Sequence, residues 1–178
     1  MTSWMTRASV AAAVTVLETL VALPALAQES TNRVATKTDW SVFTEDKPTK
    51  ECWGVSSPRE SVNTRDGAAV SVKRSDILLF ITFRPGQTAG EVSFTGGYAF
   101  AKDSKVDVDI GGQKFQLFSD GEWAWTSGPG DDAKLLTALK AGAEASLTAH
   151  SAKGTQTKDT FSLKGFSAAM DEAAGRCK

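Results

Sequence analysis

The single histidine of the sequence is the first residue to consider for catalysis. His150 would have to serve in any Ser-His or Cys-His pair, and a zinc site normally needs more than one such ligand. It follows Ser146 and Thr148 on the polar side of an expected strand, which favours an exposed surface histidine. The spacings of a nucleophile elbow, a zinc-protease helix and a phosphate-binding loop do not occur. We therefore expect neither a catalytic or metal site nor a cofactor.

Three acidic residues, Asp103, Asp107 and Asp109, could supply the oxygen ligands that calcium requires. Lys105 interrupts this cluster, and the expected hairpin pairing places Lys114 opposite Asp109, which favours a solvated strand face. A hydrolase with an unusual aspartate-based site would depend on the same three residues. It remains a third alternative for function.

Two cysteines, Cys52 and Cys177, lie near the two ends of the expected domain. In an oxidising compartment two lone cysteines usually form a disulfide, and two unpaired buried thiols are the alternative. A bridge that closes so long a loop stabilises the fold by about 4 to 5 kcal/mol in the chain-entropy model. Trp53, next to Cys52, is expected to pack on the disulfide or on the core.

Three aromatic residues, Phe118, Trp123 and Trp125, share one face of an expected meander, with Phe118 beside Trp123 and Trp125 beside Gln116. Such a patch is either covered or used. Covered means packed under a second sheet or under the helix that contains Leu135, Leu136 and Leu139, and the usual burial of large aromatics favours this. Used means a contact surface for a sugar ring or a partner protein.

The first 27 residues have the parts of a secretory signal peptide. Arg7 precedes an apolar stretch over residues 8–21, and the small residues of Ala25-Leu26-Ala27 suit signal peptidase, so we expect cleavage before Gln28. Glu18 interrupts the apolar stretch, and an uncleaved anchor is the alternative, but the stretch is short for about 30 Å of hydrocarbon. We expect export and no stable membrane span after cleavage.

The rest of the chain is expected to form one domain. Residues 28–38 are polar and aperiodic, which predicts a flexible tether, and the domain is expected over residues 39–178, with order beginning at Trp40. The formal net charge is −1, with 20 Lys and Arg against 21 Asp and Glu. A nucleic-acid partner is therefore not expected, because phosphate binding needs a surplus of positive charge.

Short alternating runs separated by turn residues predict a mainly β fold. Residues 77–83 are apolar almost throughout, which indicates a central strand buried on both faces. Gly111-Gly112 and Asp120-Gly121 predict two tight turns and hence a three-stranded meander over residues 105–125. Residues 144–150 and 155–163 are expected to form a further hairpin that turns at Lys153-Gly154.

The two turns of the meander predict its register. Pairing across the first turn sets Val108 opposite Phe115 and Val106 opposite Leu117, and pairing across the second sets Leu117 opposite Ala124. These residues form one apolar face. The agreement of apolar matching with the Asp109–Lys114 charge pair supports the register.

Two short helices complete the prediction. Asp131 or Asp132 is expected to cap a helix that ends with Lys140 in its last turn and Gly142 just after it. The second helix is expected over residues 167–174, with Gly175 as its stop and an apolar stripe of Phe166, Ala169, Met170 and Ala173. Together the elements predict a β-sandwich of about nine to ten short antiparallel strands with two helices.

The sequence resembles the invasion-associated locus B family of alphaproteobacterial exported proteins. The resemblance rests on the leader, on Trp40-Ser-Val, Cys52-Trp53 and Leu139-Lys-Ala-Gly142, and above all on the closing segment Ser162-Leu-Lys-Gly-Phe-Ser-Ala-Ala169. Members often have an extra cysteine pair in mid-chain, which is absent here, so the resemblance is to a divergent branch. It implies a periplasmic or surface-associated β-sandwich with no assigned enzymatic activity.

From the residues and the resemblance together we expect an exported, periplasmic or envelope-associated interaction protein that is not an enzyme. Its partner would be an envelope or host-surface protein or a glycan. The alternative is a glycan-binding module that uses Phe118, Trp123 and Trp125 as its platform.

Overall fold

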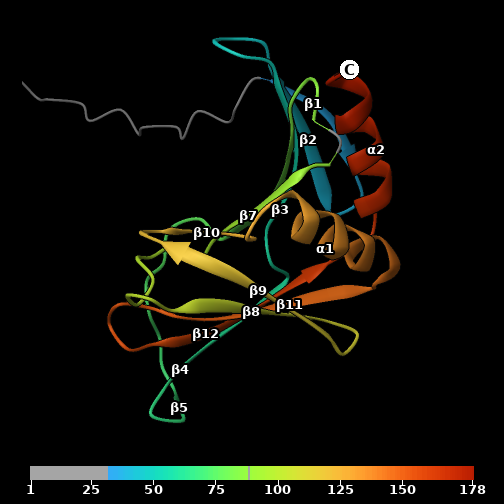
Figure 1. Cartoon of the computed structure of the whole chain (residues 1–178). Helices are drawn as coiled ribbons and strands as arrows, with labels where there is room; N and C mark the ends of the chain where they lie inside the picture. The colour runs from blue at the N-terminus through green and yellow to red at the C-terminus, as the bar shows by residue number, and fades with distance from the viewer. Residues whose placement is uncertain (1–31, 88) are drawn as a thin grey trace, which may run out of the picture.

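The computed structural model describes residues 32–87 and 89–178 (Figure 1). The expected signal peptide lies outside the described residues. The described part contains two helices, α1 (Pro129–Ala141) and α2 (Phe166–Arg176), and twelve strands. In chain order the strands are β1 (Arg33–Lys37), β2 (Trp40–Glu45), β3 (Glu51–Ser56), β4 (Glu60–Arg65), β5 (Ala68–Ala69), β6 (Leu78–Phe83), β7 (Glu91–Thr95), β8 (Lys105–Ile110), β9 (Gln113–Asp120), β10 (Trp123–Trp125), β11 (Glu144–His150) and β12 (Gln156–Ser162).

All twelve described strands belong to one antiparallel sheet in the order β1-β2-β3-β6-β7-β10-β9-β8-β11-β12-β4-β5. Figure 1 shows β1, β2 and β3 running in a different direction from β8, β9, β11 and β12, so the sheet is strongly bent. The bend brings inward-facing side chains of separate strands together. Phe94 of β7 meets Phe161 of β12 edge to face at 6.1 Å, and Trp40 Nε1 of β2 donates to the Ser162 carbonyl of β12 at 3.0 Å.

The predicted class, mainly β with two short helices, is confirmed, with twelve strands in place of nine or ten. The expectation of a tether over residues 28–38 is wrong for its last part, because β1 occupies Arg33–Lys37 and pairs with β2. Val34 and Ala35 pack against the core, which explains why this polar stretch is ordered. Strand β6 lies inside the sheet as expected, but its side chains alternate between buried and half-buried.

The meander of β8, β9 and β10 is present, with one of its two registers as predicted. Val108 pairs with Phe115 and Val106 with Leu117 across Gly111-Gly112. The second register is wrong by two residues, because Ala124 pairs with Ser119 rather than with Leu117. The turn residues are Gly121, at a φ of 58°, and Glu122, so glycine stands first in the turn instead of second. An even shift leaves every side chain on its expected face.

Helix α1 buries Leu135, Leu136 and Leu139 in the core, and Gly142 follows the helix as expected. The expected aspartate cap is wrong. Gly128 precedes the helix, Pro129 opens it, and Asp131 and Asp132 lie within its first turn. There their negative charge interacts favourably with the positive end of the helix dipole. The expected β11–β12 hairpin is present and pairs Glu144 through His150 with Ser162 through Gln156.

Helix α2 packs on β1, β2 and β3 through the apolar stripe that the sequence indicates. Trp40 meets Phe166 edge to face at 4.9 Å, and Met170 lies against Gly54 of β3. The helix continues through Gly175 to Arg176, so the expected stop at Gly175 is wrong. The end is set instead by the C-cap Cys177, whose backbone N–H donates to the carbonyl of Ala173.

Gly165 immediately precedes α2, and its backbone conformation predicts that a larger residue there would destabilise the fold. Its φ is 86°, and a Cβ there would lie 2.0 Å from the Lys37 carbonyl oxygen. We expect Gly165→Ala to lower the free energy of unfolding by about 3 kcal/mol, because left-handed strain and backbone overlap add together. Gly175→Ala is the matched control. Nothing lies within 4 Å of its Cβ position, and helix propensity should raise stability by about 0.5 kcal/mol. Urea denaturation of both variants checks the pair, and equal stabilities would contradict the expectation.

Candidate functional site

Six aromatic side chains lie on the outer face of the sheet, opposite the core. Successive residues of a strand point to opposite faces, so buried Ala124 leaves Trp123 and Trp125 on the outer face, and buried Leu79 and Ile81 leave Phe80 there. We call the complete set the aromatic face: Phe43, Trp53, Phe80, Phe118, Trp123 and Trp125.

The residues of the aromatic face lie on five strands, β2, β3, β6, β10 and β9, and β7 lies between β6 and β10 in the sheet. Trp123 and Trp125 are nearly parallel, with centroids 6.5 Å apart, and Phe80 lies 5.7 Å from Trp123. Trp125 pairs with Phe118 in the β10–β9 ladder. Phe43 and Trp53 form a second stacked pair at 5.6 Å on β2 and β3. The three aromatic residues expected from the sequence therefore belong to one larger surface.

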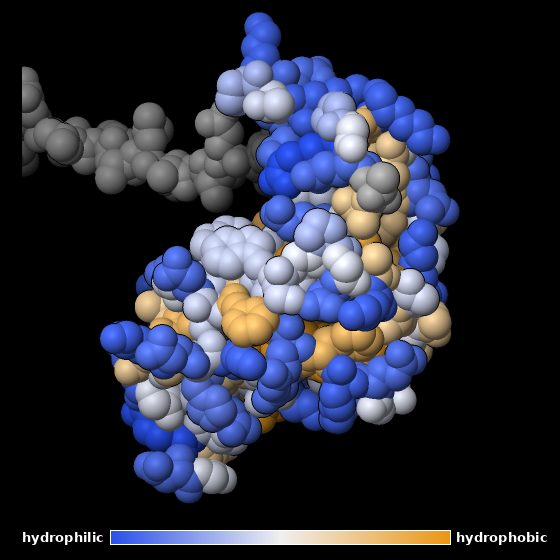
Figure 2. All heavy atoms as spheres, in the orientation of Figure 1, coloured by the Kyte–Doolittle hydropathy of each residue, from blue (hydrophilic) through white to orange (hydrophobic). Residues whose placement is uncertain are grey.

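The expectation that the patch is covered is wrong. Phe118 is 49% exposed and Trp123 is 39% exposed, while Trp125 is half-buried. The α1 leucines pack into the core, on the other side of the sheet. Ala124 of β10 points to that side, so the neighbouring Trp123 and Trp125 point away from the leucines. Figure 2 shows apolar and weakly polar side chains exposed over β9 and β10, bordered by hydrophilic ones.

The expected position of Trp53 is also wrong. It was expected to pack on the disulfide or on the core, but Cys52 is the buried residue, and Trp53 therefore points outward and lies half-buried on Phe43. Phe43, Trp53 and Phe80 were not expected from the sequence to belong to this site. The available signal was alternation, since Phe43 follows buried Val42 and Phe80 lies between buried Leu79 and Ile81.

Charged side chains border the aromatic face. A shallow groove of about 380 Å³ is lined by aromatic and polar side chains, namely Trp53, Phe80, Trp123, Trp125, Glu51, Thr82, Arg84, Glu91 and Ser93. Arg84 Nε donates to Glu51 at 2.6 Å, and its Nη1 lies 3.2 Å from Glu91. The hydrogen bond to Glu51 is the main reason that the pKa of Arg84 is raised. At another edge, Lys105 Nζ lies 4.8 Å from the Phe118 ring centroid, a cation–π geometry.

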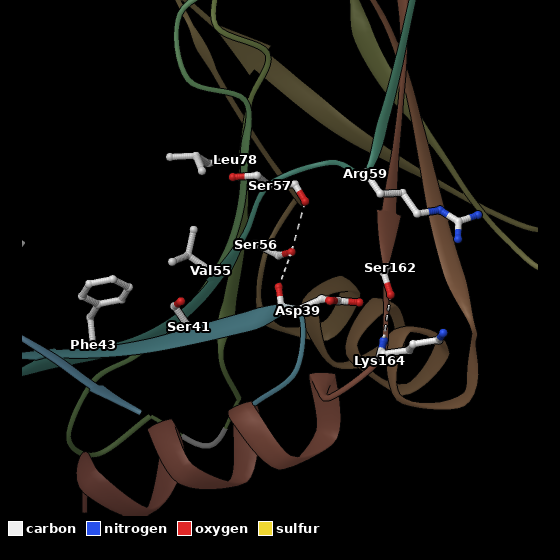
Figure 3. A pocket seen from close by; sticks show the side chains of 10 residues that line it. All are labelled: Asp39, Ser41, Phe43, Val55, Ser56, Ser57, Arg59, Leu78, Ser162 and Lys164. Atoms are coloured by element: carbon white, nitrogen blue, oxygen red, sulfur yellow. Dashed lines mark hydrogen bonds between the residues drawn. The ribbon is translucent and has the colours of Figure 1, made fainter. Parts of the chain in front are cut away.

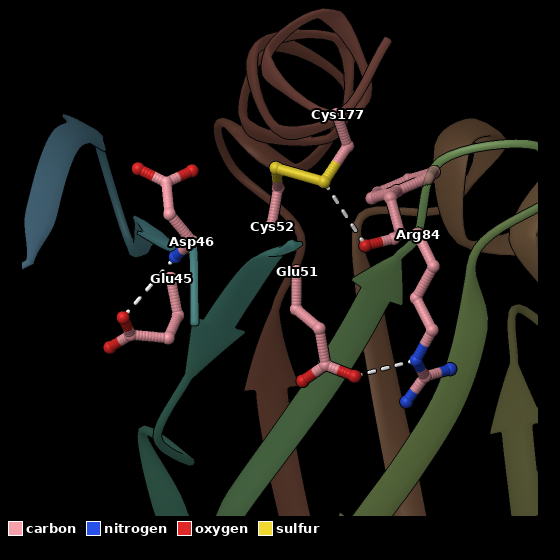
Figure 4. The surroundings of a disulfide bond; sticks show 7 residues. Glu45, Asp46, Glu51, Cys52, Arg84 and Cys177 are labelled. Atoms are coloured by element: carbon pink, nitrogen blue, oxygen red, sulfur yellow. Dashed lines mark hydrogen bonds and ion pairs between the residues drawn. A yellow bond between two sulfur atoms is a disulfide. The ribbon is translucent and has the colours of Figure 1, made fainter. Parts of the chain in front are cut away.

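A disulfide joins Cys52 of β3 to Cys177 at the end of α2, as expected (Figure 4). Their Cα atoms are 5.7 Å apart. Both residues are buried. The bridge fastens the C-terminal helix to the strand that also carries Trp53, so it holds one part of the aromatic face in place.

The residues that could support catalysis are separated or engaged elsewhere. His150 is exposed and pairs with Gln156 in the β11–β12 ladder. Asp109 forms the expected ion pair with Lys114, and Asp107 accepts a hydrogen bond from Gln116 at 2.8 Å. Among residues 32–87 and 89–178, no group of three or more His, Cys, Asp or Glu residues could hold a metal ion.

A pocket of about 430 Å³ beside β2 and β3 contains serines, a lysine and an arginine (Figure 3). Ser56 Oγ donates to the Asp39 carbonyl at 2.7 Å and approaches the Ser57 carbonyl at 3.2 Å. Figure 3 shows Arg59 and Lys164 pointing away from Ser56. The hydroxyl is thus held by backbone carbonyls, and no histidine lines this pocket to activate it as a nucleophile.

Asp132 is a buried carboxyl group beside Trp125. Its Oδ1 accepts hydrogen bonds from the Val92 backbone N–H at 2.9 Å and from Thr126 Oγ1 at 2.8 Å. Burial nevertheless dominates and raises the pKa of Asp132 above its ordinary value. Asp131, which is exposed and bonded to Ser127 and Lys134, has a lowered pKa.

The raised pKa of Asp132 predicts a pH dependence. The folded state holds the proton more tightly than the unfolded chain does, so this contribution to stability is full below pH ~4 and is lost as pH rises through the raised pKa. Asp132→Asn keeps an acceptor oxygen and removes the titration. We expect its stability relative to the parent to increase from pH 4 to pH 7 in urea denaturation. A pH-independent difference would contradict this assignment.

Within the described part of the chain, no helix has both the length and the apolar character needed to cross a membrane. No match was found among curated proteins.

Comparisons with protein-family models and with solved structures each find a similar protein. The family model described as Invasion associated locus B (IalB) protein matches residues 40–174. The crystal structure of invasion associated protein B from Bartonella henselae is similar with a TM-score of 0.55 and 16% sequence identity, over 80% of this chain and 96% of that one. At this identity the structural likeness concerns the fold. The match over residues 40–174 covers most of the sequence, and the chain belongs to the invasion-associated locus B family.

Proposed function

We propose that this protein is an exported, periplasmic or envelope-associated interaction protein that acts by binding and not by catalysis. The exposed aromatic face is the observation that carries the proposal. Phe118 and Trp123 are exposed although burial of aromatic area is strongly favourable, and tryptophan is enriched among residues that dominate binding energy. A surface of this kind is typical of contact sites.

Two further observations support the proposal. The leader over residues 1–27 has the organisation of a signal peptide, and the Cys52–Cys177 bridge suits an oxidising compartment. The polar groups that catalysis would need are engaged in structural bonds: Asp109 with Lys114, and Ser56 with backbone carbonyls.

The test is cross-linking of the tagged full-length protein in the periplasmic fraction of its own bacterium. We expect Phe118→Ala/Trp123→Ala to reduce the cross-linked partner at least about tenfold, since a central aromatic contact contributes about 2 kcal/mol or more. Because both rings are exposed, the variant should keep its melting temperature. Val62→Ala is the matched control, since Val62 is 43% exposed on β4, outside the aromatic face. Equal losses in both variants would overturn the assigned surface, and absence from the periplasmic fraction would overturn the location.

Glycan binding is the second candidate function. The near-parallel Trp123 and Trp125 rings share a groove with Glu51, Arg84 and Glu91. Aromatic faces that stack on sugar rings, beside charged groups that bond hydroxyls, have the composition of a small-ligand site. Titration with peptidoglycan fragments should then quench or shift the tryptophan fluorescence, and the response should be lost in Trp125→Ala. A flat titration would exclude this candidate for those fragments.

A further inference from the structure

A further recess, separate from the aromatic face, lies where five segments of the chain meet. It has a volume of about 560 Å³, within the range of small-molecule sites. Its lining comes from the end of β4, the segment of residues 72–74, the loop of residues 97–99 and the β11–β12 turn with the start of β12, together with Glu122. None of these residues belongs to the aromatic face. We call this recess the cationic pocket.

Three positively charged side chains at the cationic pocket have no acidic partner among the described residues. Arg65, Lys73 and Lys153 are exposed, and in the part of the chain that the structure describes none of them forms an ion pair. Arg65 is oriented by its Nη2, which donates to Thr155 Oγ1 at 2.8 Å. Glu122 is the single carboxylate among the described lining residues, so the rim has a surplus of positive charge.

The interior of the cationic pocket is largely apolar and is formed around Tyr98. Its hydroxyl lies 2.6 Å from Thr157 Oγ1, and the Arg74 guanidinium lies 5.1 Å from its ring centroid. Val72, Ala99 and Ala152 complete the apolar surface. Burial raises the pKa of Tyr98, so the ring stays neutral and does not repel an anion.

Arg74 also lines the pocket, but its charge is already compensated. Its guanidinium binds Asp159 through two hydrogen bonds of 2.8 and 2.5 Å, and the two side chains are 6% and 0% exposed. Arg74 therefore holds the tyrosine in place, while Arg65, Lys73 and Lys153 remain available for a ligand.

We propose that the cationic pocket binds an amphipathic anion, in which a carboxylate or phosphate group meets Arg65, Lys73 and Lys153 and a short apolar chain lies on Tyr98, Val72 and Ala99. Both halves of the ligand are required. An inorganic anion would gain only screened charge interactions, and an uncharged apolar chain would leave the cations unpaired.

The test uses octanoate and octyl phosphate as probes of the two anionic groups, with the folded mature protein in two-dimensional amide NMR and calorimetry. We expect at least one probe to shift the amides of Gly97, Ala99 and Ala152 saturably, with an affinity that falls as salt is added. Acetate, inorganic phosphate and octanol should bind at least about tenfold more weakly. The stronger of the two probes identifies a carboxylate or a phosphate as the preferred group.

Charge-removing variants distinguish binding in the cationic pocket from non-specific attraction of anions to the protein surface. Arg65→Gln/Lys73→Gln should weaken binding at least about tenfold, whereas Lys47→Gln/Lys102→Gln removes two exposed charges outside the pocket and should leave binding unchanged. Ala152→Trp, at the exposed rim, should block the probes without altering the charge. The proposal is overturned if neither probe shifts these amides, if acetate binds as well as octanoate, or if both charge variants behave alike.

Discussion

Replacement of Cys52 and Cys177 by serine is expected to lower the free energy of unfolding by about 5 kcal/mol. The bridge spans 125 residues of sequence, and in the chain-entropy model a loop of this length restricts the unfolded chain by about that amount. Because domains are stable by only about 5 to 15 kcal/mol, the loss is a large share of the total. Urea denaturation of the double variant measures it directly, and the melting temperature should fall by roughly 10 to 20 °C.

A reductant provides the control for this prediction. Wild-type protein with its bridge reduced should match the double serine variant, because both lack the same cross-link. The core contact between Trp40 and Phe166 remains in both, so the folded state should keep its circular dichroism spectrum. A loss smaller than about 2 kcal/mol would show that the unfolded chain is already compact and that the bridge contributes little.

The second large effect is expected at the buried ion pair of Arg74 and Asp159. Arg74→Met should lower the free energy of unfolding by about 3 to 5 kcal/mol, because it leaves the Asp159 carboxylate buried without its counter-charge. Three side-chain nitrogen or oxygen atoms donate to this carboxylate, and two of them belong to Arg74. Only Ser61 Oγ, at 2.7 Å, would remain as a side-chain donor among the described residues. The same change releases the bond from Arg74 Nε to the Gly96 carbonyl at 2.8 Å and the contact with the Tyr98 ring. Chemical denaturation at neutral pH gives the value.

A double variant separates the charge from the packing. Arg74→Met/Asp159→Asn removes both charges and keeps an acceptor for Ser61, so it should recover at least half of the stability that Arg74→Met loses. Arg74→Lys should be intermediate, because it restores a charge without the two-pronged contact. If the double variant is as unstable as Arg74→Met, the unpaired carboxylate is not the cause.

Several features of this protein follow from the sequence alone because they are local. Period-2 alternation and paired glycines located β8 and β9 in their register, and the Lys153-Gly154 turn located the β11–β12 hairpin. Apolar residues at helical spacing indicated both helices. The cysteine pairing also followed, since two cysteines within one domain leave one intramolecular partner each.

Local signals were weaker where more than one turn fits the same residues. Gly121 can stand first or second in a two-residue turn, and the structure takes the first, so β10 is shifted by two residues from its expected register. The shift is even, and the assignment of Trp123 and Trp125 to a common face was therefore correct. The start of the domain was missed for a related reason, because β1 is held by its pairing with β2 and shows little pattern of its own.

Alternation determined by itself that Phe118, Trp123 and Trp125 share one face, but only the tertiary structure decided that this face is open. The burial of a side chain depends on which elements lie over its face of the sheet. Here the sheet bends around the core, and both helices and the inward-facing side chains lie on the side opposite these aromatic residues. The Arg74–Asp159 pair joins residues 85 positions apart, and the cationic pocket is built from five separate segments. Such contacts carry no local periodicity, because long-range packing of the whole chain selects them.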